Sequence, residues 1–249
     1  MTLNDFFGLH PRAGIAFSGG VDSAYLLYAA IQSGARVKAY YVKSAFQPAF
    51  ELEDAKKIAE RIRADMTVID LDVLDCERIA ANPPDRCYHC KRRIFSAIVE
   101  RANADGFDTL FDGTNASDDA GDRPGMRALR ELKVLSPLRE CGLTKPEIRE
   151  RSKEAGLFTW NKPAYACLAT RIRTGEVITR EKLEKTELAE GYLYSLGFSD
   201  FRVRMAGGAA RIQVTPSQIQ RVLTLRNDIL SALKKYYDAV TLDLEVRDE

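Results

Sequence analysis

The sequence predicts an α/β protein with a doubly wound parallel sheet and a smaller C-terminal α/β module. Short apolar runs alternate with helical patterns through the first half of the 249 residues, and a glycine-rich turn joins the first strand to the first helix. A loop-rich stretch at 160–178 then precedes a second set of helices and strands. We therefore expect two domains, with bounds 1–165 and 166–249.

The elements of the first half follow one another in strict alternation. The expected strands are 14–17, 36–42, 66–71 and 109–112, and the expected helices are 21–33, 51–64 and 90–105. A further helix is expected at 144–155, because Thr144 is followed three residues later by Glu147, which is the pattern of a capping box.

The second half has a different order of elements. A helix is expected at 179–195 with another capping box at Thr179, and strands at 201–205 and 210–214 flank Gly207-Gly208, which is a hairpin signal. One helix is expected over 216–235, with Pro216 near its start, and a last strand over 239–246.

Composition limits the function classes. A net charge of +1 gives no bulk attraction to nucleic acid or to a membrane surface. The 45% hydrophobic content is ordinary for a globular protein, and no apolar leader or run of 18 apolar residues occurs. We expect a cytoplasmic protein whose five cysteines serve a metal or a reaction rather than a disulfide framework.

The stretch after the first strand predicts a phosphate site. Its backbone N–H groups point outward at the start of a helix, where the helix dipole favours an anion. A carboxylate in such a loop is explained if Mg²⁺ lies between it and the phosphates. The alternative is an ordinary Gly-Gly turn with a Ser or Asp cap. The residues are Ser18, Gly19, Gly20, Val21, Asp22 and Ser23.

Further candidates follow the other strands. Ligands of open α/β sheets bind beyond the carboxyl ends of the strands, which is where Ser44, Gly113, Thr114 and Asn115 fall. A nearby acidic loop is either solvated surface or an additional Mg²⁺ ligand; it contains Asp118, Asp119 and Asp122.

Two cysteines stand in a C-x-x-C pattern, Cys87 and Cys90. The pattern alone allows a redox pair, half of a zinc site or two iron–sulfur ligands. The other ligand candidates are Cys76, Cys141, Cys167 and His10. Cys167 is the best third ligand because its loop is polar and turn-rich, whereas Cys76 and Cys141 stand beside apolar residues. Three thiolates suit a [4Fe-4S] cluster with one open position.

Several motifs together resemble a known family. The SGGVDS loop resembles the PP-loop of ATP pyrophosphatases, and SGGVDS, PPDRCYHCK, FDGTN, PGMRAL, VLSPLRECGLTKPEIR and NKPAYACLATRI occur in the order found in LarE-type ATP-dependent sulfur transferases. After the cysteine, the family's S-R-I-P-Y-G is replaced by Thr170 to Gly175, with Arg173 and Thr174 as the departures.

The resemblance implies a function and assigns roles. The family adenylates a carboxylate of pyridinium-3,5-biscarboxylic acid mononucleotide and converts it to a thiocarboxylate for the nickel-pincer cofactor of lactate racemase. The first domain would bind and adenylate, and the second would serve sulfur transfer and oligomerisation, as a hexamer with a separate sulfide donor. The resemblance gives Ser18–Ser23 to the ATP phosphates, Asp22 to Mg²⁺, Lys91 to the developing charge on phosphorus, and Cys167 to sulfur transfer. Ser44, Gly113–Asn115 and Arg171 are also expected to bind the nucleotide. It gives Cys87, Cys90 and Cys167 to a [4Fe-4S] cluster, and it places Glu190, Arg202 and Arg204 at a subunit contact that binds anions and metal.

Two other hypotheses on the function stay open. A tRNA thiolation enzyme shares the PP-loop and a three-cysteine cluster, but it calls for a basic, aromatic-rich surface, which the net charge of +1 does not favour. A non-catalytic nucleotide-binding iron–sulfur sensor would bind ATP without releasing pyrophosphate.

Overall fold

The chain divides into two compact units. The computed structural model describes residues 1–118 and 124–247. The first unit comprises Met1–Val73 and Asp85–Lys162, and the second comprises Leu74–Pro84 and Pro163–Glu249. The chain therefore passes from the first unit into the second and back before it enters the second unit again at Pro163.

The first unit contains a parallel sheet of four strands in the order β3-β2-β1-β4. The strands are β1 (Arg12–Ala16), β2 (Arg36–Lys43), β3 (Met66–Asp70) and β4 (Leu110–Phe111). Gly14 is opposite Lys38 on one side and Leu110 on the other. The strand order reverses direction at β1, as a doubly wound sheet requires, so the expected fold class is confirmed.

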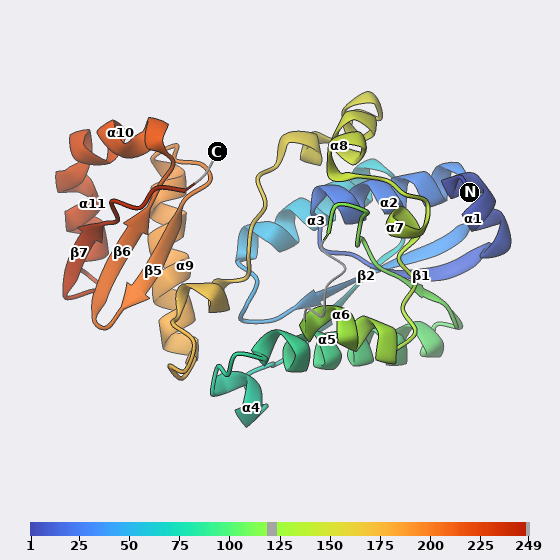
Figure 1. Cartoon of the computed structure of the whole chain (residues 1–249), viewed down its shortest axis with the longest axis horizontal. Coiled ribbons are helices and arrows are strands. Elements are labelled where there is room, and N and C mark those ends of the chain that lie inside the picture. Colours follow the sequence, from blue (N-terminus) through green and yellow to red (C-terminus); the bar gives the residue numbers. More distant parts are fainter. Residues whose placement is uncertain (119–123, 248–249) are drawn as a thin grey trace. The chain divides into compact units, whose positions relative to one another are not determined.

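Helices cover both faces of this sheet (Figure 1). One face packs on a core built largely from α1, α2, α3, α7 and α8, and the other packs on α5. The helices of this unit are α1 (Leu3–Leu9), α2 (Val21–Gln32), α3 (Ala49–Arg61), α5 (Arg86–Ala104), α6 (Pro124–Glu131), α7 (Pro137–Glu140) and α8 (Lys145–Glu154), with the 3-10 turn η1 (Phe158–Asn161).

Several boundaries in the first unit differ from expectation by a few residues, and two of these differences, at α5 and β4, concern predicted site residues. Helix α5 begins at Arg86 instead of residue 90, so that Cys87 and Cys90 both lie on the helix. The sequence pattern missed this start because Pro83 and Pro84 precede it and polar residues fill its first turn. Strand β4 has two residues instead of four, because beyond Phe111 the chain bonds to the loop at Leu135 instead.

The second unit has a three-stranded sheet in the order β5-β6-β7. Strands β5 (Arg202–Ala206) and β6 (Ala209–Gln213) form the expected antiparallel hairpin, with Gly207 at φ +59°, and β7 (Ala239–Leu242) pairs parallel with β6. Apolar side chains of the sheet share a core with three helices, α9 (Arg180–Ser195), α10 (Ile219–Thr224) and α11 (Arg226–Leu233).

Three expectations for the second unit are wrong. The last strand, expected over 239–246, ends at Leu242. The single helix over 216–235 is three pieces, the 3-10 turn η3 (Pro216–Gln218) followed by α10 and α11, which are separated at Leu225. At α9, Thr179 caps the helix through the Lys182 N–H, but a lysine at this position has no carboxylate to return the bond. The capping box at Thr144 of α8 is confirmed.

Residues 74–84 leave the first unit and belong to the second, where the bonds of one asparagine hold them. They include helix α4 (Glu77–Ala80), and Asn82 follows it fully buried with φ +56°. The Asn82 amide donates to the carbonyls of Arg173 at 2.8 Å and Glu176 at 3.1 Å, and its own carbonyl accepts from the Gly175 N–H at 2.8 Å. The sequence predicted one domain boundary, after residue 165. In the structure the second unit also includes residues 74–84, so the chain crosses between the units at these residues as well.

No helix in the described parts of the chain has the length and apolar character needed to cross a bilayer.

Candidate active site

The predicted phosphate loop forms the turn between β1 and α2. Gly20 is the N-cap of α2 and, lacking a side chain, supplies no capping bond. The Ser23 hydroxyl accepts from the Ser18 N–H at 3.2 Å and donates to the Gly20 carbonyl at 3.3 Å. The two serine hydroxyls are 3.1 Å apart. These bonds close the loop on itself and leave the first turn of α2 to face an anion.

Gly19 is required by the geometry of this loop. It has φ +70°, and a Cβ there would lie 2.9 Å from the Ala55 Cβ and 3.0 Å from the Ala55 Cα on α3. The loop can approach α3 this closely only without a side chain.

Asp22 in the first turn of α2 has two partners from other elements. The Lys145 Nζ lies 2.5 Å from one carboxylate oxygen, and the Asn115 Nδ2 donates to the other at 3.3 Å. Asn115 was predicted as a binding residue, and the structure brings it to Asp22. Lys145 is the first residue of α8, and the sequence reasoning passed over it; the signal was a cation beside the Thr144 cap.

The segment after β4 packs directly on the phosphate loop. A Cβ at Gly113 would lie 3.0 Å from the Ser23 backbone nitrogen, which explains the glycine. Thr114 donates its hydroxyl to Asp112, and Ser136 donates to the same carboxylate at 2.6 Å. Thr114 thus shapes the segment that carries Gly113 and Asn115.

Asp112 is a buried carboxyl that the sequence reasoning did not select. Burial raises its pKa, against the opposing effects of the hydroxyls of Ser136 and Thr114 and of the Lys91 charge. Lys91 is therefore close enough to this strand end to act electrostatically there. Its side chain also lies against Gly125 of α6, where a Cβ would be 2.8 Å from the Lys91 Cδ.

Ser44 directly follows β2 and has a structural partner. Its hydroxyl donates to the Gln47 Oε1 at 2.7 Å and accepts from the Phe46 N–H at 3.2 Å. The residue lies at the carboxyl end of the strand next to β1, as expected, and it holds the turn into α3.

The acidic loop is described only in part. Asp118 accepts from the Asn115 N–H at 2.9 Å and so closes a local turn. Asp119 and Asp122 lie outside the described residues.

Cys87 and Cys90 lie at the start of α5, three residues apart, and so on one side of the helix. Cys87 is exposed and Cys90 half-buried, and the buried Arg86 guanidinium approaches the Cys87 sulfur at 3.8 Å. His89 between them bonds instead to Asp85 at 2.9 Å.

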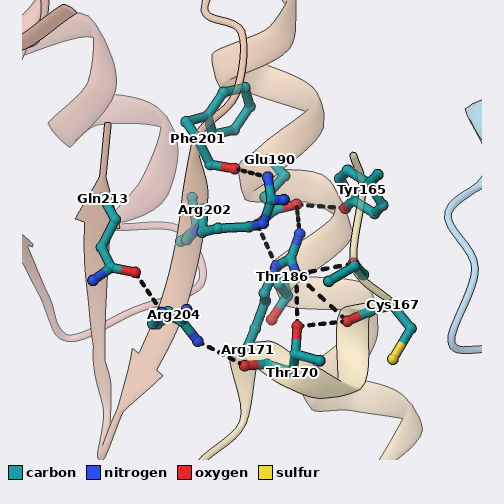
Figure 2. Close-up of polar contacts among 12 residues, drawn as sticks. Tyr165, Cys167, Thr170, Arg171, Thr186, Glu190, Phe201, Arg202, Arg204 and Gln213 are labelled. Carbon is teal, nitrogen blue, oxygen red and sulfur yellow. Dashed lines mark hydrogen bonds and ion pairs between the residues drawn. The ribbon is translucent and has the colours of Figure 1, made fainter. Parts of the chain in front are cut away.

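Cys167 precedes the 3-10 turn η2 (Leu168–Arg171) in the second unit. Figure 2 shows its sulfur directed away from a cluster of polar side chains that hold its backbone. Arg171 is the centre of this cluster: its side chain is 1% exposed and forms an ion pair with Glu190 at 2.8 Å. The role in ATP binding expected for Arg171 stays a prediction, and what the structure gives it is this internal partner.

The expected subunit-contact residues are Glu190, Arg202 and Arg204. Glu190 and Arg202 are 4% and 5% exposed within a single chain. Arg202 donates to the carbonyls of Phe201 and Ala164, and burial lowers its pKa to about 10. The polar groups of Glu190 and Arg202 are bonded inside the second unit, and Arg204 is half-buried. Their place at a subunit contact that binds anions and metal stays a prediction.

The three candidate cluster ligands are divided between the units. Cys87 and Cys90 belong to the first and Cys167 to the second, and none of the five cysteines is in a disulfide. In residues 1–118 and 124–247 no three His, Cys, Asp or Glu side chains are grouped so as to hold a metal ion. The thiol donors fit an iron–sulfur cluster by their chemistry: they are three thiols, two of them on one side of a helix.

The fold and the loop define a class. A parallel sheet whose first strand leads through Ser-Gly-Gly-Val-Asp-Ser to a helix, with a second polar segment from β4 against that loop, is a PP-loop nucleotide-binding domain. Residues 12–82 match the model of the queuosine biosynthesis protein QueC family.

Full-length relatives narrow the class to a family. The chain is 32% identical over 236 residues to the pyridinium-3,5-bisthiocarboxylic acid mononucleotide synthase of Lactiplantibacillus plantarum, covering 94% of this chain and 86% of that protein. It is 37% identical over 248 residues, 98% of this chain and 92% of the relative, to an uncharacterized protein of Synechocystis. The tRNA-specific 2-thiouridylase MnmA of Thermotoga petrophila is 25% identical over 61% of this chain and 54% of its own length.

The chain belongs to the LarE family, and it is an ATP-dependent sulfurtransferase of the PP-loop class. The expected family and enzyme class are confirmed, and the hypothesis of a non-catalytic sensor is set aside.

Proposed function

We propose that this enzyme adenylates a carboxylate of pyridinium-3,5-biscarboxylic acid mononucleotide and converts it to a thiocarboxylate. Two rounds would give the bisthiocarboxylate used in the nickel-pincer cofactor of lactate racemase, in the cytoplasm. The observation that carries the proposal is the 32% identity to a protein named for this product over 94% of the chain.

The first step needs a site that holds ATP open at its α-phosphorus. In the proposal the phosphates bind at Ser18–Ser23 and the first turn of α2, with Mg²⁺ at Asp22. A substrate carboxylate oxygen attacks the α-phosphorus, the bond to the β-phosphate oxygen breaks, and pyrophosphate leaves. Lys91 is suited to stabilise charge there as a fixed cation, since its charge acts at the end of β4.

The second step replaces AMP by sulfur. Carboxylate oxygen is a poor leaving group, whereas AMP is a good one, so adenylation makes the acyl carbon reactive. Hydrosulfide adds to that carbon, AMP departs with the electron pair of the C–O bond, and a proton is released to water. The product is a thiocarboxylate, and no oxidant or reductant is consumed.

We further propose that Cys87, Cys90 and Cys167 hold a [4Fe-4S] cluster. Such a cluster supplies an iron position that no thiolate of the protein occupies, where exogenous sulfide can bind. The support is the donor set: two thiols near the N-terminus of α5, one of them beside Arg86, and a third in a loop whose backbone is held by arginines. A hexamer and an external sulfide donor belong to the same proposal.

The relation to MnmA supports a second candidate, a tRNA thiolation enzyme. Its match is confined to 61% of this chain, and the net charge of +1 offers no general attraction to RNA. Salt-sensitive binding of tRNA, without pyrophosphate release in the presence of the pyridinium mononucleotide, would favour this alternative.

One experiment tests the main proposal and its sulfur source. Anaerobic protein is supplied with ATP, Mg²⁺, sulfide and the biscarboxylic mononucleotide, and pyrophosphate, thiocarboxylate and intact protein mass are followed together. Many turnovers at constant protein mass support cluster-based transfer. A loss of one H₂S from Cys167 per product would mean that this cysteine gives up its own sulfur, and no pyrophosphate with this substrate would refute the substrate assignment.

A further inference from the structure

The backbone around Cys167 is held by arginines from three positions in the second unit. Arg202 Nη2 donates to the Ala164 carbonyl at 2.8 Å, Arg171 Nη1 donates to the Ala166 carbonyl at 2.9 Å, and Arg204 Nη1 donates to the Thr170 carbonyl at 2.9 Å. The loop is thus bonded before and after its cysteine (Figure 2).

Arg171 is the only one of the three that belongs to the loop itself. Its Nη1 also donates to the Thr170 hydroxyl at 2.7 Å, and that hydroxyl donates to the Cys167 carbonyl at 2.8 Å. One side of the guanidinium therefore fixes the turn at Cys167 from within, while the other side faces Glu190.

Glu190 of α9 anchors that guanidinium to the core of the unit. It accepts from the Arg171 Nε at 2.8 Å and from Nη2 at 3.1 Å, and it also accepts from the Tyr165 hydroxyl and from the Val203 N–H. Each carboxylate oxygen has two donors, so the position of the pair is fixed by α9, β5 and the loop together.

A gain in folding stability does not by itself explain why an ion pair between Arg171 and Glu190 is buried here. A buried ion pair gives up the hydration of both charges, and an apolar pair of similar size is often as stable. What an apolar pair would not supply is a set of donors for the loop carbonyls. In the pair Arg171 keeps its charge: burial acts to lower its pKa, but Glu190 more than offsets this and the net shift is upward.

We propose that the Arg171–Glu190 pair is a positioning device that holds the backbone at Cys167 in one conformation, so that its sulfur is presented outward for transfer. In this proposal Arg171 and Glu190 are positioning residues and neither acts on the substrate, so positioning replaces the role in ATP binding expected for Arg171. The proposal rests on the proposed role of Cys167 in sulfur transfer, and it extends that role to residues inside the second unit.

The test uses the double variant Arg171→Met/Glu190→Leu in the full chain. It replaces the ion pair by apolar side chains of similar size and avoids leaving one charge buried alone. The single variant Arg171→Lys retains a cation but loses the paired bonds. Arg221→Met is the control, since Arg221 of α10 is exposed, donates to the Leu196 carbonyl and lies over the Phe198 ring in the same unit.

Three measurements are made on each variant. They are hydrogen exchange of the 164–172 peptide, alkylation of Cys167 relative to Cys76 at one pH, and the steady-state constants for pyrophosphate and thiocarboxylate formation. For the double variant we expect exchange of the peptide to accelerate at least tenfold and a changed alkylation ratio. We also expect roughly tenfold or greater loss of kcat for thiocarboxylate with the KM for ATP unchanged. Arg171→Lys should fall between, and Arg221→Met should behave as wild type.

Wild-type exchange and alkylation in the double variant would overturn the positioning proposal, whatever its activity. If the double variant does not fold, the same two measurements on Arg171→Lys decide the question. Wild-type protein that forms neither pyrophosphate nor thiocarboxylate would instead count against the proposed function. The exchange data would still support or refute the positioning role in that case.

Discussion

The Lys145 ammonium lies 2.5 Å from the Asp22 carboxylate, 123 residues away in sequence, at the mouth of the phosphate loop. Both side chains are partly exposed, at 32% and 22%. The first turn of α2 and the first residue of α8 therefore meet as an ion pair where the nucleotide phosphates are expected. A cation held there is a ready phosphate ligand once Mg²⁺ engages Asp22.

Lys145→Met should weaken ATP binding by roughly tenfold, or ~1.4 kcal/mol, since the variant keeps the apolar stem and removes only the charge. Titration calorimetry with a non-hydrolysable ATP analogue and Mg²⁺ measures it. Lys153→Met, at the other end of α8, is the control and should bind as wild type. Equal affinity in Lys145→Met and wild type would show that the lysine serves only Asp22.

Gly19→Ala should lower both stability and ATP binding. Its Cβ would meet the Ala55 backbone at 3.0 Å, and its φ of +70° is strained for alanine. We expect a cost of about 2 kcal/mol or more. Gly34→Ala is a matched control, because Gly34 has φ +80° but nothing within 4 Å of an added Cβ, so it carries only the backbone cost of ~1 kcal/mol. Thermal unfolding compares the two, and equal losses would contradict the close approach of the loop to α3.

Asp112→Asn should change how stability depends on pH. Burial raises the Asp112 pKa in the folded chain above the usual 3.8, so the folded state binds more protons between the two values. The contribution of this carboxyl to stability therefore falls as pH rises through that window. Relative to wild type, the variant should gain in Tm as the pH rises from about 4 through the raised pKa of Asp112. A constant Tm difference would mean that Ser136, Thr114 and Lys91 offset the burial.

Cys87→Ala should abolish the broad visible absorption of an anaerobically reconstituted cluster, while Asp22→Ala should keep the absorption and lose pyrophosphate release. Cys141→Ala is the control for loss of a thiol, because burial raises the pKa of the Cys141 thiol, which disfavours the thiolate needed to bind iron. Iron and sulfide analysis accompanies the spectra. A colourless wild-type protein with full multiple-turnover activity would refute the cluster. Loss of the cluster in Asp22→Ala with adenylation preserved would mean that the adenylation site and the cluster site have been assigned to the wrong residues.

The phosphate loop and the order of the first strands were predictable because local chemistry encodes them. Gly19 and Gly20 between an apolar strand and a helix can be interpreted without tertiary information, and the Thr144 capping box marks its own helix. The partners of these groups were not predictable in this way. Lys145 reaches Asp22 only because α8 packs on α2, and nothing in the sequence near either residue indicates it.

The same limit applies to the second unit. The sequence pattern over 216–235 is helical throughout, so the break at Leu225 had no local signal. A charged residue such as Glu190 is ordinarily exposed on a helix, and only the packing of α9 against η2 and β5 identifies it as the buried partner of Arg171. Local sequence patterns thus predict where the loops lie, whereas long-range packing determines which side chains bond to their residues.

Asn82→Ala should destabilise the second unit, because it removes the amide that bonds to Arg173 and Glu176 in a fully buried site. Leaving buried carbonyls without a donor costs about 1–3 kcal/mol, and alanine at φ +56° adds strain that asparagine tolerates. Asn82→Gly separates the two effects, since glycine accepts the conformation but supplies no amide. The free energy of unfolding in urea should fall from wild type to Asn82→Gly to Asn82→Ala, with Asn161→Ala at an exposed position as the control.

Because Asn82 lies five residues before Cys87 and bonds to the loop that follows Cys167, both variants should also lower the iron content after reconstitution. Unchanged iron content in a variant of measurably lower stability would show that the asparagine fixes the fold without fixing the cysteines.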